Sequence, residues 1–154
     1  MIYVQLRSFY DGQKTVAMDW VVITVALCAC AQKNEPESNF NPEPLDGGKS
    51  VAITGYTGSS WTVRIPPKIQ QLPVTHIGRE AFGSKNLTSV TIPNSVITID
   101  VYAFSENQLT SITIGSNVSM WGSLIFDNGF DTFYNAQGRV AGTYVRSGDS
   151  WSRQ

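Results

Sequence analysis

The chain has 154 residues, of which 42% are apolar, and its 11 basic and 12 acidic side chains leave a net charge of −1. Since single domains of about 100 to 150 residues are the common case, one folded core is expected rather than two. The absence of a broad basic field argues against nucleic acid as a partner. Charged residues make up 15% of the chain, below the roughly 25% usual in soluble domains, which favours strands and turns over long surface helices.

The first predicted element is a signal peptide over residues 1–29. Its apolar run, WVVITVALCA at residues 20–29, is shorter than the roughly 20 residues of a membrane-spanning helix and matches the core of a secretory signal. The run ends in Leu27-Cys28-Ala29-Cys30, which resembles the lipobox of bacterial lipoproteins. That resemblance implies cleavage before Cys30 and attachment of lipid to Cys30. The alternative is a buried strand, because the run is rich in β-branched residues.

Residues 30–48 follow as a predicted disordered tether. They contain three prolines and four acids but only two large apolar residues, Phe40 and Leu45. Because so little apolar surface cannot fold alone, the segment is expected to join a lipidated cysteine to a folded domain. By resemblance to lipoprotein sorting, Ala31 after Cys30 implies delivery to the outer membrane of a two-membrane cell. The chain is therefore expected at the bacterial cell envelope, exposed at the surface.

A repeat of 22 residues dominates the remainder: LTSVTIPNSV at 87–96 returns as LTSITIGSNV at 109–118. A third copy lies upstream, with Val63 and Ile65 in the strand positions. A period in the twenties is typical of a solenoid, whose coils must stack to bury their apolar edges. Alternation predicts that these side chains point inward: Leu87, Val90, Ile92, Leu109, Ile112 and Ile114. Superposing the copies pairs Ile99 with Trp121 and Phe104 with Phe126, and places His76 at the position of Thr98 and Met120.

The repeat carries a family resemblance. The pattern L-x-x-[VI]-x-I-P-x-x-V-x-x-I-x-x-x-A-F, seen as LTSVTIPNSVITIDVYAF, resembles the BspA-type leucine-rich repeat of bacterial surface proteins. This resemblance covers roughly residues 49–154. It implies a leucine-rich repeat solenoid, a right-handed β/α superhelix that is mostly β with short helical turns and hairpin caps at both ends. The expected parts are an N-terminal hairpin at 49–66, repeats at about 61–130 and a C-terminal cap at 131–154, with paired strands at 144–146 and 150–152.

No set of residues in the sequence points to catalysis or to a bound metal. His76 is the only histidine, no cysteine follows Cys30, and the motifs H-E-x-x-H and G-x-S-x-G are absent. A metal site or a nucleophilic hydrolase would need such groups together. The sequence therefore predicts no enzyme, no metal and no cofactor. Only a pair of facing carboxylates in a cleft would restore an enzyme as a hypothesis.

The remaining candidate is the surface of the predicted strands. Their outward positions are expected to align into a polar ladder, which we name the polar face: Thr62, Arg64, Ser89, Thr91, Ser111 and Thr113. Solenoids use such aligned faces for extended contacts with proteins, although a solvated sheet face has the same composition. Aromatic residues are expected mostly to pack under the ends of the solenoid, and any cluster left outside would mark an interface.

The resemblance implies an adhesin that engages host extracellular-matrix proteins or other bacteria. Together with the lipobox and the tether, it predicts a membrane-anchored, surface-exposed module for protein-protein interaction or adhesion, held by lipid on Cys30. The alternative is a self-associating structural or antigenic surface protein without a dedicated ligand, in which an uncovered coil edge pairs with a second copy. The oligomeric state stays open at this point.

Overall fold

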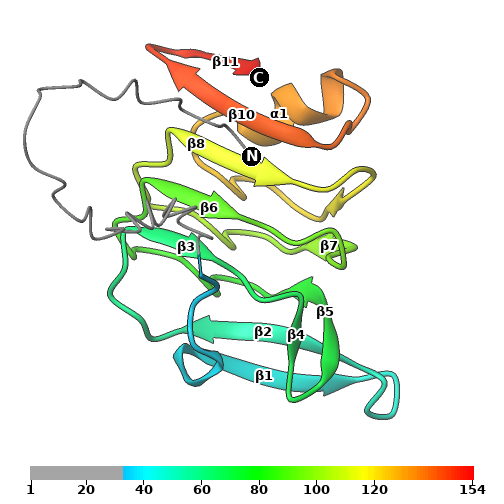
Figure 1. Cartoon of the computed structure of the whole chain (residues 1–154). Helices are drawn as coiled ribbons and strands as arrows, with labels where there is room; N and C mark the ends of the chain where they lie inside the picture. Colours follow the sequence, from blue (N-terminus) through cyan, green and yellow to red (C-terminus); the bar gives the residue numbers. More distant parts are fainter. Residues whose placement is uncertain (1–32) are drawn as a thin grey trace, which may run out of the picture. The chain divides into compact units, whose positions relative to one another are not determined.

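The computed structural model describes residues 33–154, which form a mostly β solenoid of about three coils with one α-helix (Figure 1). The predicted signal peptide and Cys30 lie outside the described residues. None of the helices between residues 33 and 154 has the length and apolar character needed to cross a membrane.

Two sheets form the walls of the solenoid. The first sheet has the strand order β1-β2-β5-β7-β9, with β4 also paired to β5, and the second sheet has the order β11-β10-β8-β6-β3. In chain order the elements are the 3-10 helix η1 (Glu37–Asn39), β1 (Phe40–Leu45), β2 (Ser50–Tyr56), β3 (Thr62–Arg64), β4 (Lys68–Ile69), β5 (Leu72–Ile77), β6 (Ser89–Thr91), β7 (Thr98–Ile99), β8 (Ser111–Ile114), β9 (Ser119–Met120), α1 (Phe130–Ala136), β10 (Gly142–Ser147) and β11 (Ser150–Arg153).

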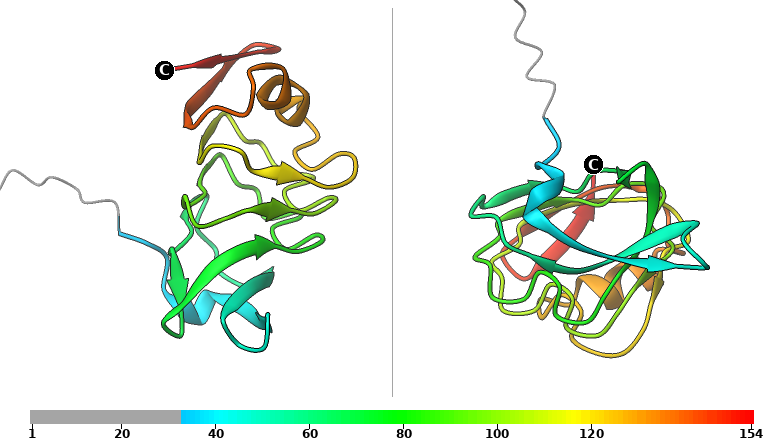
Figure 2. Two further views of the ribbon diagram at one scale, coloured as in Figure 1. Left: turned by 90° about the vertical axis from the view of Figure 1, so that its right-hand side faces the viewer. Right: turned by 90° about the horizontal axis from the view of Figure 1, so that it is seen from below.

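Each coil contributes one strand to the second sheet and then one to the first, as the stacked strands in Figure 2 show. The coil strands pair in parallel, so Val63, Val90 and Ile112 lie directly opposite one another. All three side chains are fully buried, as the alternation predicts. The five extra residues of the first coil form a tight antiparallel turn between β4 and β5, with Gln70 and Gln71 at positive φ.

A row of stacked aromatic rings runs through the core along the coils. Phe82, Phe104 and Phe126 recur every 22 residues, with ring centroids 4.9 Å apart for the first pair and 5.0 Å apart for the second. Their planes differ by 14° and 2°. The row continues at the two ends through these buried rings: Phe40, Tyr56, Phe130, Tyr134, Tyr144 and Trp151.

Three tyrosines of this core keep neutral hydroxyl groups. Burial raises the pKa of Tyr56, Tyr134 and Tyr144 above the usual value of 10.0, because the interior disfavours a phenolate. The hydroxyl of Tyr134 lies within hydrogen-bonding distance of the carbonyl of Arg139 at 3.1 Å and accepts from the N–H of Val118 at 3.4 Å. The hydroxyls of Tyr134 and Tyr144 reach the carbonyls of Arg139 and Val140, and they thereby join the chain between α1 and β10 to the core.

The predicted N-terminal hairpin at 49–66 is wrong. Both of its strands exist, but β2 pairs antiparallel with β1 and parallel with β5, whereas β3 pairs parallel with β6 in the other sheet. The chain between them crosses from one wall of the solenoid to the other. Alternating apolar residues identify a strand and its buried side but not the strand with which it pairs. A strand in either sheet can bury one side against the core, so the pattern does not tell the two sheets apart.

The predicted tether extends too far toward the folded domain. Residues 40–45 form β1, paired with β2 from Phe40 opposite Tyr56 to Leu45 opposite Ser50, and Phe40 is only 3% exposed. Proline is tolerated here because β1 is an edge strand, where Pro42 and Pro44 need no N–H on the open side. A single buried ring thus anchors a segment whose composition predicts disorder.

The superposition of the last two coils shifts by one residue in the first sheet. Thr98 lies opposite Ser119 and Ile99 opposite Met120, so Trp121 does not take the place of Ile99. The predicted match of His76 with Thr98 is confirmed, whereas the match with Met120 is wrong. As a result Trp121 is 67% exposed. A shift of one residue turns a strand side chain to the opposite face.

The last two strands form an antiparallel pair at the end of the second sheet. Ser147 lies opposite Ser150, so the turn consists of Gly148 and Asp149. The strands expected at 144–146 and 150–152 fall within β10 and β11. Because β10 also pairs antiparallel with β8, the hairpin is joined directly to the last coil.

Candidate functional site

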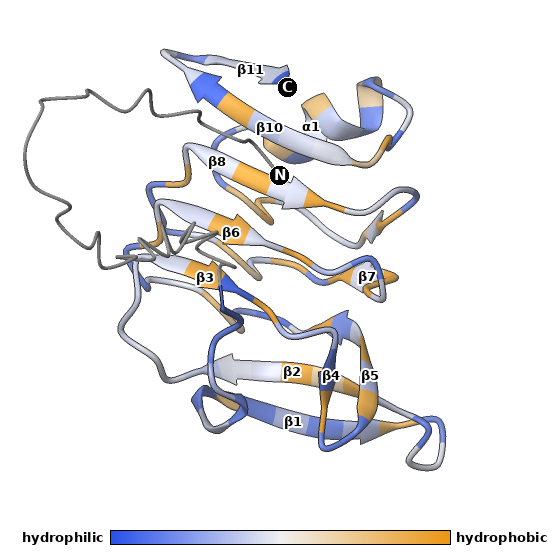
Figure 3. Ribbon diagram, viewed as in Figure 1, coloured by the Kyte–Doolittle hydropathy of each residue, from blue (hydrophilic) through white to orange (hydrophobic). Residues whose placement is uncertain are grey.

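The polar face predicted from the sequence forms two straight rows across the second sheet. Thr62, Ser89 and Ser111 lie opposite one another in one row, and Arg64, Thr91 and Thr113 form the second. Within each strand the residue between the two rows is buried, and β3, β6 and β8 each carry an apolar segment there (Figure 3). The side chains of both rows therefore point away from the core. All six predicted residues are therefore brought together on one surface.

Both rows continue onto the closing hairpin, which the sequence analysis missed. Ser111 lies opposite Val145, and Thr113 lies opposite Thr143 with their hydroxyl oxygens 2.9 Å apart. Val145 in turn lies opposite Ser152 on β11. The 22-residue repeat ends before these residues. The alternation around Tyr144, which is buried, was the signal that could have placed Thr143 and Val145 on the outer side.

The polar face is a flat surface of hydroxyl groups with one cation. Hydroxyls both donate and accept hydrogen bonds, and Arg64 supplies a guanidinium at the edge strand β3. The N–H of Glu35 donates to the carbonyl of Arg64 at 2.9 Å, so the chain before η1 runs beside part of this edge. Next to β3, the side chain of Trp61 is 70% exposed. Such a surface suits contact with another macromolecule rather than a reaction.

No grouping of reactive side chains accompanies this face. Within residues 33–154, no three His, Cys, Asp or Glu side chains lie close enough to hold a metal ion. His76 lies in the first sheet, between Ala52 and Thr98, and its Nδ1 is 2.9 Å from the hydroxyl of Thr75. It is therefore on a different wall of the solenoid from the polar face.

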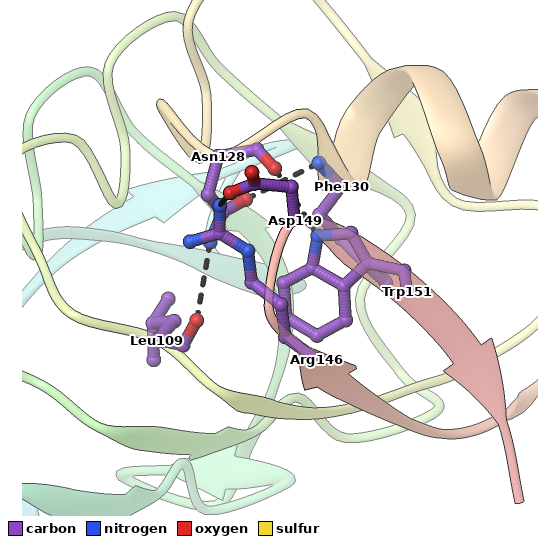
Figure 4. A network of polar contacts seen from close by, with 6 residues as sticks. All are labelled: Leu109, Asn128, Phe130, Arg146, Asp149 and Trp151. Atoms are coloured by element: carbon purple, nitrogen blue, oxygen red, sulfur yellow. Dashed lines mark hydrogen bonds and ion pairs between the residues drawn. The ribbon is translucent and has the colours of Figure 1, made fainter.

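A polar network holds the closing hairpin and α1 against the last coil (Figure 4). The side chain of Asn128 donates to the carbonyl of Leu109 at 3.3 Å and accepts from the N–H of Phe130 at 3.2 Å. The indole N–H of Trp151 donates to the carbonyl of Asn128 at 3.2 Å. Arg146 and Asp149 form an ion pair at 3.3 Å beside it. These contacts fix the last two strands of the polar face in place.

The comparisons with known proteins agree with the repeat geometry. Residues 65–133 match the family described as BspA type Leucine rich repeat region (6 copies). This segment is a BspA-type leucine-rich repeat region. The leucine-rich repeats thus span the coils that carry β6 and β8, at the centre of the polar face.

A solved structure resembles the repeat region as well. The crystal structure of the T. pallidum Leucine Rich Repeat protein (TpLRR) is similar to this chain with a TM-score of 0.51 and 30% sequence identity. The similarity covers 52% of this chain and 38% of that protein, so the chain matches well under two thirds of its length. No curated protein matches the chain.

Proposed function

We propose that the chain is a membrane-anchored, surface-exposed leucine-rich repeat module that binds a protein through its polar face. The observation that carries this proposal is the alignment of two outward rows on the second sheet. One row runs over all five strands, from Thr62 to Ser152 with Val145 as its apolar member, and the other runs over four strands, from Arg64 to Thr143. Leucine-rich repeat domains are protein-protein interaction modules, and solenoids commonly bind along such aligned faces. The partner is a host matrix protein or a bacterial surface protein.

The size of the face indicates how a partner would use it. Five strands at a spacing of about 4.8 Å span roughly 20 Å, and rows two residues apart along a strand lie roughly 7 Å from each other. The two rows therefore cover on the order of 100–200 Å², well below the roughly 800 Å² that each partner contributes to a stable interface. The rows alone are therefore the centre of the contact, and flanking residues must complete it. Trp61 is the flanking residue best suited to anchor a partner, because exposed aromatic rings contribute strongly at interfaces.

The binding role of the polar face is tested with a substitution at its centre. We expect Thr91→Lys in the full-length chain to weaken binding to immobilised fibronectin, laminin or collagen by at least tenfold, because a long charged side chain separates the two surfaces. Surface plasmon resonance measures the affinity. Ser119→Lys is the matched control, since Ser119 is half-buried like Thr91 and lies opposite Thr98 on the first sheet, away from the polar face. Equal losses in both variants, or no loss in Thr91→Lys, would contradict the proposal.

Anchoring through lipid on Cys30 is tested separately. We expect the full-length chain, expressed in a bacterium that processes lipoproteins, to appear in the membrane fraction with the mass of a chain cleaved before Cys30 and acylated. A Cys30→Ser variant should lack that mass. An unmodified chain recovered from the cytosol in both cases would rule out the anchor and with it the cell-envelope location.

Self-association without a dedicated ligand is the second candidate, and the edges of the two sheets bear on it. In β1, Pro42 and Pro44 remove two N–H donors from one open edge, which hinders pairing with another strand. The edge strand β11, with Ser150 to Arg153, contains no proline. Light scattering on the full-length chain measures its molar mass in solution. A molar mass that doubles as the protein concentration rises would favour self-association over ligand binding.

A further inference from the structure

A hollow of about 350 Å³ lies on the outer side of the first sheet, on a different wall from the polar face. Its residues come from distant parts of the chain. Sheet pairing places Glu43 opposite Ala52, Ala52 opposite His76, and His76 opposite Thr98. Asp100 and Trp121, which follow β7 and β9, complete its wall. We name it the first-sheet hollow.

Small side chains create the first-sheet hollow. Ala52 occupies the outward position between the longer side chains of Glu43 and His76, so the sheet surface is lowest there. Gly78 adds a second small floor residue, and its N–H donates to the carbonyl of Ile53 at 2.8 Å, which fixes the backbone beneath the hollow. Beside this floor stands the indole of Trp121, which is 67% exposed and therefore offers a ring surface to a ligand.

The charges around the hollow have one sign. Glu43 and Asp100 contribute two carboxylates, and no lysine or arginine lines the hollow. Among residues 33–154 neither carboxylate takes part in an ion pair. One oxygen of Asp100 accepts from the N–H of Val101 at 2.7 Å, which orients that carboxylate and leaves its second oxygen for a ligand.

We propose that the first-sheet hollow binds an arginine side chain presented by a peptide or a partner protein. The guanidinium group is complementary to carboxylates, with which it forms paired hydrogen bonds, and it stacks on the face of an indole. Its aliphatic stem fits the apolar floor at Ala52. A volume near the lower end of the roughly 300–1,000 Å³ of ligand pockets suits one extended side chain. The hollow lies apart from the polar face, so this site goes beyond the proposed function.

The test uses the full-length chain and small ligands that differ in one group. N-acetyl-arginine amide is titrated while the indole N–H signals of Trp121 and Trp61 are followed by NMR, which reports dissociation constants in the millimolar range. The signal of Trp121 is expected to shift with saturation, whereas that of Trp61, equally exposed but beside β3, stays unchanged. N-acetyl-citrulline amide, which has the same shape without the charge, is expected to bind at least fivefold more weakly.

Variants separate the contributions of charge and ring. Glu43→Gln is expected to weaken binding about threefold, the range of a partly exposed ion pair, and Trp121→Ala about fivefold through loss of the cation–π contact and apolar area. Asp131→Asn, on α1 and outside the hollow, is the matched control and should leave binding unchanged. Equal binding of the arginine and citrulline amides would overturn the proposal, and so would tighter binding of a monosaccharide such as glucose. A Trp121 signal that does not shift at about 50 mM ligand, a concentration high enough to detect millimolar binding, would overturn it as well.

Discussion

Replacing Phe104 by alanine is expected to lower the free energy of unfolding by about 4 kcal/mol, the middle of the range for removing a large buried aromatic side chain. Since domains of this kind are stable by only about 5–15 kcal/mol, this single change is expected to remove a large part of the total. The melting temperature should fall by roughly 10–20 °C.

The reason is the position of Phe104 at the centre of the aromatic row. Its ring is fully buried and stacks on Phe82 on one side and on Phe126 on the other. Alanine removes both ring contacts, each worth about 0.5–1.5 kcal/mol beyond the buried area, and leaves a cavity between two coils. In a solenoid each coil is stabilised by its neighbours alone, so the loss weakens both coil interfaces at once.

Chemical unfolding followed by circular dichroism measures this effect. Phe133→Ala is the matched control, because Phe133 packs only partly buried against the core and contacts Tyr144 at 6.0 Å between ring centroids. That variant is expected to lose about 1–2 kcal/mol. If Phe104→Ala lost no more stability than Phe133→Ala, the stacked rings would not be what holds the coils together.

The sequence alone was sufficient to predict which side chains of the coils are buried. Leu87, Val90 and Ile92, together with their counterparts 22 residues later, are all 2% exposed or less. The alternation of apolar and polar residues indicates which positions are buried, and the same positions are apolar in successive repeats, which strengthens the prediction. The two outward rows of the polar face follow from the same alternation, which is why all six of their residues could be named in advance.

Pairing outside the repeated coils and the closing hairpin was beyond the sequence patterns. β2 and β3 are both recognisable strands, but their membership of two different sheets depends on contacts with β5 and β6. β1 is held by the burial of one ring, Phe40, which its polar and proline-rich composition conceals. The first-sheet hollow could not be predicted for the same reason, because only the fold brings Glu43, His76 and Trp121 around one hollow.

Asn107 lies between β6 and β8, and its side chain joins two successive coils. Its side-chain N–H₂ group lies within hydrogen-bonding distance of the carbonyls of Phe82 at 2.7 Å, Phe104 at 2.9 Å and Ser105 at 3.1 Å. Its side-chain oxygen accepts from the N–H groups of Leu87 at 2.9 Å and Lys85 at 3.2 Å. One amide thus satisfies backbone groups of the preceding coil and of its own.

We expect Asn107→Ala to lower the free energy of unfolding by about 3 kcal/mol, since a half-buried backbone group that loses its partner costs about 1–3 kcal/mol and water can replace only some of these bonds. Asn107→Asp separates the two halves of the network. A carboxylate keeps the acceptor for Leu87 and Lys85 but sets a negative charge against the carbonyls of Phe82 and Phe104. It is therefore expected to be no more stable than the alanine variant.

Asn128→Ala is the matched control for this prediction. Asn128 lies one residue before the position equivalent to Asn107, and its side chain makes only two hydrogen bonds, at 3.3 Å and 3.2 Å. Its replacement is expected to cost about 1 kcal/mol. Equal losses for the two alanine variants would mean that Asn107 acts as an ordinary turn residue. A larger loss for Asn107 would mean that adjacent coils are held in register by polar contacts as well as by the stacked rings.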